Sequence, residues 1–255
     1  MIKCEDIMSF MEKIAPRELA EEWDNVGLLL GNRDNEVKKI LLCMDVTASS
    51  VSYAVNNGVD MIISHHPFIF KKLGRLVEND AKGSVIYTLI RNNISVFAAH
   101  TNLDFAVSGV NDCLAEALEI GNAETYGNGP GKVGTLKKEV KLTDFIEKVK
   151  SALDTKKLRV IGDDERSIKK AAVFSGSFDD DLDAVKNTNA DVLVTGDIKY
   201  HTALDACGEN LCIIDAGHFN TEKIVLPSLA KRLGESFTDI DIMLFTEEED
   251  PFKTY

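Results

Sequence analysis

Two histidines stand side by side in a chain that has only five histidines in 255 residues. The stretch MIISHHPFIF places His65 and His66 directly after an apolar run and directly before Pro67. A single histidine is most often a packed or exposed side chain, but a pair at the end of a buried strand needs another explanation. Neutral imidazole is a ligand that suits zinc, iron and manganese, so the pair predicts transition-metal chemistry.

Two further histidines are each followed by an acid four residues later. The segments HTNLD and HFNTE give the pairs His100 with Asp104 and His218 with Glu222. Side chains four apart on a helix share one face and can serve one metal centre. A helix start that is capped by Asn would carry the same residues without any metal. The repetition of the pattern beside a double histidine favours the metal site.

Together these residues form a candidate ligand set for two ions. A carboxylate can bridge two metal ions, and two such acids suit a pair about 3.5–4 Å apart with an open coordination position. Pro67 restricts His66 to extended backbone, so we expect the rings of His65 and His66 to point apart and to serve different ions. The predicted cofactors are two divalent transition-metal ions per chain, which are iron, zinc or manganese. The predicted metal ligands are His65, His66, His100, Asp104, His218 and Glu222.

Short apolar runs alternate with helical patterns along the chain, which predicts an α/β fold with mostly buried sheets flanked by helices. Four of the histidines lie just after such runs, at the strand ends where functional groups gather in open α/β sheets. We expect strands within residues 38–45, 59–64, 94–99, 169–176, 190–196, 211–215 and 239–245. We expect helices near residues 4–14, 48–57, 83–93, 108–120, 143–153, 180–188, 198–207 and 221–234.

The two halves of the chain resemble each other. KILLCMDVT, VDMIISHH and ISVFAAHTNLD follow one another at spacings similar to those of AAVFSGS, ADVLVTGD and LCIIDAGHFNTE. Either the chain contains an internal duplication, or short α/β units match here by chance. The first interpretation predicts two similar, interlocked domains with the dinuclear site between them. The glycine-rich stretch YGNGPGKVG marks the boundary, with residues 1–126 and 215–255 in the first domain, 127–214 in the second and no inserted third domain.

Composition excludes several classes of protein. The net charge of −13 argues against broad nucleic-acid binding, which needs clustered Lys and Arg. No apolar stretch approaches the roughly 18 residues that cross a bilayer, and the N-terminal amphipathic pattern carries acids that a signal peptide lacks. We therefore expect a cytoplasmic protein without a membrane partner. The five scattered cysteines indicate reduced, mostly buried thiols, and EEED near the C-terminus is expected to be a solvated acidic tip.

Several single residues have both a structural and a functional interpretation. Trp23, the only tryptophan, is expected to anchor the core or an interface, while Asp24 and Asn25 could orient a ligand or serve structure alone. Asp45 ends a strand and could face the site, followed by Thr47 as the expected cap of a helix. His201, in IKYHTALDA, is the candidate catalytic acid or base, or else an inward-facing structural histidine.

At these motifs the chain resembles the Nif-three-like dinuclear metal-centre proteins, often labelled GTP cyclohydrolase I type 2 homologues. The matching segments are EEWDNVGLLLG, DVTASSV, ISHHPFIF, AAHTNLD, TGDIKYHTALDA and DAGHFNTE, spread over nearly the whole length. The resemblance implies a two-domain α/β fold, a dinuclear site on the six predicted ligands and commonly a toroidal homohexamer. It also implies a small-molecule substrate, with GTP as the candidate whose guanine imidazole ring is opened with release of formate.

The sequence supports two classes of function. A metal-dependent hydrolase would use two ions to activate water and to polarise a nucleotide-like substrate. A non-enzymatic protein would bind metal for delivery, sensing or assembly and would fill every coordination position with protein groups. The chain also departs from the resembled family in VFSGSFDDDLDAV, where Phe178 and three aspartates replace small residues. Either this loop contacts something different, or its acids start the following helix.

Overall fold

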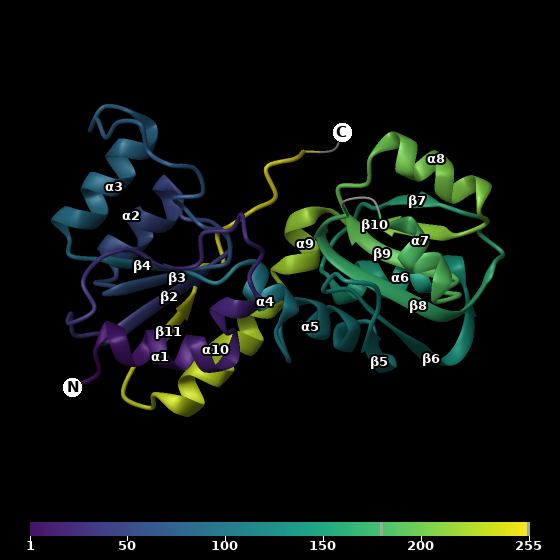
Figure 1. Cartoon of the computed structure of the whole chain (residues 1–255), viewed down its shortest axis with the longest axis horizontal. Helices are drawn as coiled ribbons and strands as arrows, with labels where there is room; N and C mark the ends of the chain where they lie inside the picture. Colours follow the sequence, from purple (N-terminus) through teal and green to yellow (C-terminus); the bar gives the residue numbers. More distant parts are fainter. Residues whose placement is uncertain (179–180, 254–255) are drawn as a thin grey trace. The chain divides into compact units, whose positions relative to one another are not determined.

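The computed structural model describes residues 1–178 and 181–253. The chain divides into two compact units that each contain one sheet (Figure 1). The first unit is Met1–Val107 with Leu226–Glu249, and the second unit is Ser108–Val225 with Asp250–Tyr255. The mixed α/β class predicted from the sequence is confirmed, because both sheets are flanked by helices.

The sheet of the first unit is built around buried parallel strands. Its order is β1-β4-β3-β2-β11, in which β1 alone runs antiparallel to its neighbour. Every residue of β3 and β4 is buried, as expected for apolar runs that helices cover on both faces. The strands are β1 (Gly27–Leu30), β2 (Lys39–Cys43), β3 (Met61–Ser64), β4 (Ser95–Ala98) and β11 (Asp241–Leu244).

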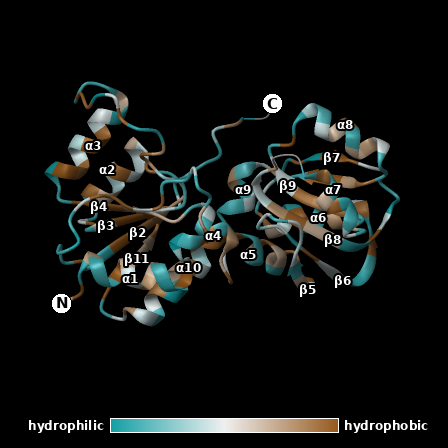
Figure 2. Cartoon of the chain, viewed as in Figure 1, coloured by the Kyte–Doolittle hydropathy of each residue, from teal (hydrophilic) through white to brown (hydrophobic). Residues whose placement is uncertain are grey.

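Helices cover the two faces of this sheet, with α2 and α3 on one side and α1 and α10 on the other (Figure 1). Thr47 caps α2 as predicted, because its side chain accepts a hydrogen bond of 3.1 Å from the Ser50 N–H. The brown strands in Figure 2 show where the apolar residues of the core concentrate. The helices are α1 (Cys4–Ile14), η1 (Arg17–Leu19), α2 (Ala48–Asn56), α3 (Ala81–Arg91), α4 (Thr101–Phe105) and α10 (Val225–Ser236).

The second unit has a six-stranded sheet of order β5-β6-β8-β9-β10-β7. Strands β8, β9 and β10 are parallel, and β5, β6 and β7 pair antiparallel with their neighbours. The strands are β5 (Ile120–Thr125), β6 (Lys132–Lys141), β7 (Arg159–Ile161), β8 (Ser167–Ser177), β9 (Val192–Gly196) and β10 (Cys212–Asp215). The helices are α5 (Val110–Ala117), α6 (Leu142–Ala152), α7 (Leu182–Asn187), α8 (Tyr200–Gly208) and α9 (His218–Glu222).

The two sheets share one four-strand arrangement. In the first unit β1-β4-β3-β2 consists of three parallel strands and an antiparallel strand beside β4. In the second unit β7-β10-β9-β8 repeats this order and these directions, and helices intervene at the same points of the chain. The likeness read from the sequence therefore has a counterpart in topology, and α4 and α9 occupy equivalent positions after the third parallel strand.

The domain bounds differ from those that the sequence suggested. The stretch of residues 126–134 is no boundary in the structure, because it makes the turn between β5 and β6 and begins β6 within the second unit. The division falls instead after Val107, and the chain returns to the first unit at Leu226, later than residue 215. The reason is that β5 pairs with β6 and α9 packs on β8 and β9. Among the described residues, no helix is long and apolar enough to cross a membrane.

Candidate metal centre

Three imidazole rings meet where β3 and β4 of the first unit end. His65 and His66 follow β3 directly, and His100 comes two residues after the end of β4. Each offers a ring nitrogen that lies within 4.8 Å of those of the other two. The rings of His65 and His66 have centroids only 5.0 Å apart, so the expectation that they point apart is wrong. The chain bends at both residues, and the alternation of side chains along an extended strand does not apply there.

Each of these rings is anchored through its Nδ1 atom. His65 Nδ1 donates to the Ala99 carbonyl oxygen at 2.9 Å, because a carbonyl can only accept. His66 Nδ1 lies 3.1 Å from Asp45 Oδ1, and His100 Nδ1 lies 2.9 Å from Asp24 Oδ1. Hydrogen bonds of this kind fix the tautomer and orientation of metal-binding histidines and make the imidazole more basic. They leave Nε2 as the candidate ligand atom of each ring.

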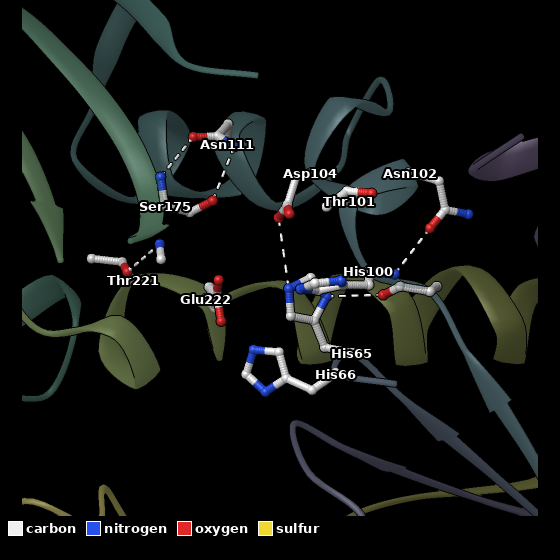
Figure 3. A network of polar contacts seen from close by, with 12 residues as sticks. His65, His66, His100, Thr101, Asn102, Asp104, Asn111, Ser175, Thr221 and Glu222 are labelled. Atoms are coloured by element: carbon white, nitrogen blue, oxygen red, sulfur yellow. Dashed lines mark hydrogen bonds and ion pairs between the residues drawn. The ribbon is translucent and has the colours of Figure 1, made fainter. Parts of the chain in front are cut away.

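Asp104 lies beside this cluster, in α4 of the first unit. The His65 Nε2 atom is 3.6 Å from Asp104 Oδ1, as the dashed line in Figure 3 marks. Two ligands of one tetrahedral ion are about 3.4 Å apart when each bond is about 2.1 Å. The separation therefore suits two ligands of a shared ion, as the sequence proposed for this acid.

In the second unit, His218 and Glu222 are paired on α9. His218 Nε2 is 3.1 Å from Glu222 Oε2, again close to the separation of two ligands on one ion. The His218 Nδ1 atom is 2.9 Å from Asp197 Oδ2. The histidine of the second unit is thus held by a carboxylate in the same way as His66 and His100, and Asp197 is an orienting residue that the sequence analysis did not identify.

A glycine makes room for the carboxylate of Glu222. Gly176 has φ +68°, and a Cβ atom added to it would lie 2.2 Å from Glu222 Oε1. The Gly176 N–H donates to Thr221 Oγ1 at 2.9 Å, and Asn111 fixes the preceding Ser175 through two hydrogen bonds (Figure 3). The end of β8 is therefore tied to both α5 and α9, and only glycine leaves the space that Glu222 occupies.

Asp24 holds the His100 side of the cluster. Its carboxylate accepts hydrogen bonds from His100 Nδ1 and from the backbone and side chain of Thr101. Burial opposes ionisation of this acid, but the bonds from His100 and Thr101 outweigh it and lower its pKa from 3.8 to about 2. Asp24 therefore remains an anion at neutral pH. Of the two interpretations of this residue, its contact with His100 favours the one in which it orients a ligand.

Glu248 was missed by the sequence analysis, which assigned EEED to a solvated tip. Its carboxylate accepts the backbone N–H groups of Met44 at 2.8 Å and Asp45 at 2.7 Å. Burial raises the pKa of Glu248, and the two hydrogen bonds offset part of that rise. The contact fixes the segment that follows β2 and so places Asp45 beside His66.

His201 belongs to a different helix of the second unit from His218 and Glu222. It is exposed on α8 and borders a cavity of about 570 Å³ with residues that include Lys186 and Lys199. The described lining of that cavity contains neither His218 nor Glu222. In the loop where the chain differs from the resembled family, Asp181 accepts the Ala184 N–H at 2.8 Å and caps α7. For this acid, the interpretation as a helix start therefore holds. Asp179 and Asp180 lie outside the described residues.

Comparison with known proteins agrees with this fold. A "GTP cyclohydrolase 1 type 2 homolog" of Clostridium perfringens is 36% identical, with 99% of each chain covered. A Bacillus cereus protein related to NIF3 has a structure that matches with a TM-score of 0.94 at 28% identity, over 100% of this chain and 99% of that one. The Staphylococcus aureus hypothetical protein SA1388 matches with a TM-score of 0.93 at 31% identity, over 99% of both chains.

The family assignment rests on nearly the whole length of the chain. The sequence model described as Duf34/NIF3 (NGG1p interacting factor 3) matches residues 2–251. That range contains all six predicted ligands and the carboxylates Asp24, Asp45 and Asp197 that hold their imidazoles. The chain belongs to the DUF34/NIF3 family.

Proposed function

We propose that His65, His66, His100, Asp104, His218 and Glu222 bind two transition-metal ions, and that the protein is a metal-dependent hydrolase of a nucleotide-like substrate. The observation that carries this proposal is the anchoring of every one of the four imidazoles through Nδ1. A metal-binding histidine almost always has such a partner on its other ring nitrogen, and here all four predicted histidine ligands have one.

The donor set fits iron, zinc or manganese. It consists of neutral nitrogen and carboxylate oxygen, and the described cysteines lie outside it. When bound, such ions supply Lewis acidity that polarises a substrate and lowers the pKa of water. The protein's own groups hold this arrangement in place: Asp24, Asp45 and Asp197 aim the Nε2 atoms of three histidines, and Gly176 admits the carboxylate of Glu222.

The proposed reaction is hydrolysis of the guanine imidazole ring of GTP, in keeping with the names of the relatives, "GTP cyclohydrolase 1 type 2 homolog". Two water molecules are consumed, and the bonds from C8 to N9 and to N7 both break. C8 leaves as formic acid, while N9 takes one proton and N7 takes two. His201 is the proposed proton-transfer residue, which its exposure on α8 leaves accessible.

The test is an assay of formate release. Protein reconstituted separately with iron, zinc and manganese is incubated with GTP, with phosphoesters and with small amides, and products are separated by chromatography. We expect formate from GTP with at least one metal, and none from a His65→Ala variant. A reconstituted protein that holds two ions per chain but hydrolyses none of these substrates would contradict the hydrolase and would favour metal delivery or sensing.

We further propose that the chain assembles as a homohexamer. The proposal rests on the resemblance described above, and it predicts a particle of six chains of 28.1 kDa. Light scattering coupled to size exclusion measures this mass directly. A monomer that persists at micromolar concentration would contradict it.

A further inference from the structure

The only tryptophan of the chain is exposed, and it lies beside a predicted metal ligand. Trp23 retains 60% of its accessible surface. It is therefore not an anchor in the core of the first unit, and the alternative expectation, an interface residue, stays a prediction. Its ring meets that of Phe70, itself 44% exposed, edge to face with centroids 5.8 Å apart. The two rings form an exposed apolar patch, and contiguous patches of this kind are candidates for binding surfaces.

The aromatic pair belongs to the same scaffold as the three imidazoles. The ring of His100 lies 6.2 Å from that of Trp23 and 6.4 Å from that of Phe70, edge to face in both contacts. Asp24 anchors His100, and the Asn25 side-chain amide donates to the Ile69 carbonyl oxygen. The consecutive residues Trp23, Asp24 and Asn25 therefore fasten an exposed aromatic surface to the candidate metal centre.

A basic cavity begins one residue after Phe70. It has a volume of about 500 Å³, and its lining carries the cations Lys71, Lys72, Arg75 and Lys82 with the acid Asp80. Arg75 pairs with Asp80 at 3.2 Å, whereas Lys71 and Lys72 have no ion-pair partner among the described residues. Such an excess of positive charge, in a chain of net charge −13, suits an anionic group.

We propose that the base of a purine nucleotide packs against Trp23 and Phe70, stacked on one ring and edge-on to the other, and that its phosphates enter the basic cavity lined by Lys71 and Lys72. The inference rests on the proposed function, because it places the ring to be hydrolysed beside His100. Flat apolar rings next to ammonium groups match the two ends of a nucleotide. Base stacking on aromatic side chains tolerates different bases, so contacts other than the pair supply the choice among purines.

Trp23 itself provides the signal for the test. Because it is the only tryptophan, the intrinsic fluorescence of the zinc-loaded protein reports on this position alone. We expect GTP to quench the emission saturably, and tripolyphosphate to compete with GTP without quenching. Calorimetry should show that Phe70→Leu weakens GTP binding by roughly 5- to 150-fold and leaves tripolyphosphate binding within about twofold. Lys72→Ala should weaken the binding of both probes, and Lys13→Ala on α1 serves as the matched control.

Three results would overturn the inference. The first is an emission that stays constant while calorimetry shows saturation by GTP, and the second is wild-type affinity in Phe70→Leu. The third is a Trp23→Leu variant with wild-type nucleotide affinity but a lower mass in light scattering, because the aromatic pair would then be a contact between copies of the chain. Formate release with no quenching contradicts only this inference. Quenching with no formate release contradicts only the hydrolase.

Discussion

The Nδ1 atom of His100 lies 2.9 Å from the carboxylate of Asp24, a residue 76 positions earlier in the chain. The pairing of β1 with β4 explains the contact, because Gly27 lies opposite Ala98 in antiparallel register. Residues just before β1 must therefore lie beside residues just after β4. The same register that builds the sheet edge brings an orienting carboxylate to a candidate metal ligand.

Replacing Asp24 should weaken metal binding without removing a ligand. In Asp24→Asn the His100 ring loses its anionic acceptor, and loss of such a partner costs roughly 10- to 100-fold in metal affinity. Competition with a chromogenic chelator measures the dissociation constant. Asp34→Asn is the control, since the Asp34 carboxylate is exposed and pairs with Lys3. Equal affinity in the wild type and Asp24→Asn would remove Asp24 from the site.

Asp24 should also contribute to acid stability of the metal-free protein. Its pKa is lowered to about 2 in the folded state, so the stabilisation is complete above its unfolded pKa near 3.8 and is lost as pH falls from about 4 towards 2. The shift corresponds to about 2 kcal/mol at neutral pH. Urea unfolding at a series of pH values should show this difference between wild type and Asp24→Asn above pH 5, and convergence near pH 2.

Gly176→Ala should disturb the predicted ligand pair of the second unit. The added methyl group would meet Glu222 Oε1 at 2.2 Å, and the φ angle of +68° strains any residue with a Cβ atom. We expect lower metal content and a loss of about 1–3 kcal/mol in the free energy of unfolding. Gly208→Ala is the matched control, because nothing lies within 4 Å of a Cβ atom at that position in α8. Full metal occupancy in Gly176→Ala would contradict the placement of Glu222 as a ligand.

Loss of either predicted bridging acid should reduce binding of both ions. Asp104→Ala and Glu222→Ala should each lower metal content, measured by elemental analysis, while circular dichroism shows a retained fold. His201→Ala should keep its metal and slow turnover by roughly 10²–10⁴ if this residue transfers protons. A His201→Ala protein that loses metal, beside an Asp104→Ala protein that keeps it, would reverse the two assignments.

Thiol chemistry should distinguish one cysteine from the other four. Cys207 is exposed, whereas Cys4, Cys43, Cys113 and Cys212 are buried. Burial raises the pKa of the Cys4, Cys43 and Cys212 thiols, which disfavours the reactive thiolate. Ellman's reagent should therefore titrate one thiol per native chain quickly and five after unfolding. A Cys207→Ser protein that still reacts quickly would show that the core of one unit opens.

Elements with strong periodicity were predictable from the sequence. Helix α1 spans Cys4–Ile14 as expected, because Ile7 and Met11 recur on one buried face. Strand β5 was not predicted, since Ile120 is the only buried residue of six and the rest carry no apolar signal. Strand β1 was also missed: its run GLLL is apolar but only four residues long, and its strand state depends on antiparallel pairing with β4. Pairing partners decide such short or weakly buried strands.

The candidate ligands were predictable from the sequence, but the contact of Glu248 that fixes the segment beside His66 was not. His65, His66 and His100 follow apolar runs, so their strand-end positions can be read locally. The contact of Glu248 with the Met44 N–H depends on β11 pairing in parallel with β2, over about 200 residues of sequence. No local pattern contains that register, and an acidic run by itself resembles any solvated surface.

The return of the chain to the first unit sets an order on its synthesis. Residues 241–249 supply β11 and Glu248, yet a ribosome makes them only after the whole of residues 108–225. Until then β2 is an unpaired sheet edge, which invites association with other chains, and the Asp45 segment beside His66 lacks its carboxylate anchor. A nascent or truncated chain can therefore fold the second unit while the segment beside His66 still lacks its anchor. If the proposed metal centre is correct, we expect metal loading to follow completion of the polypeptide.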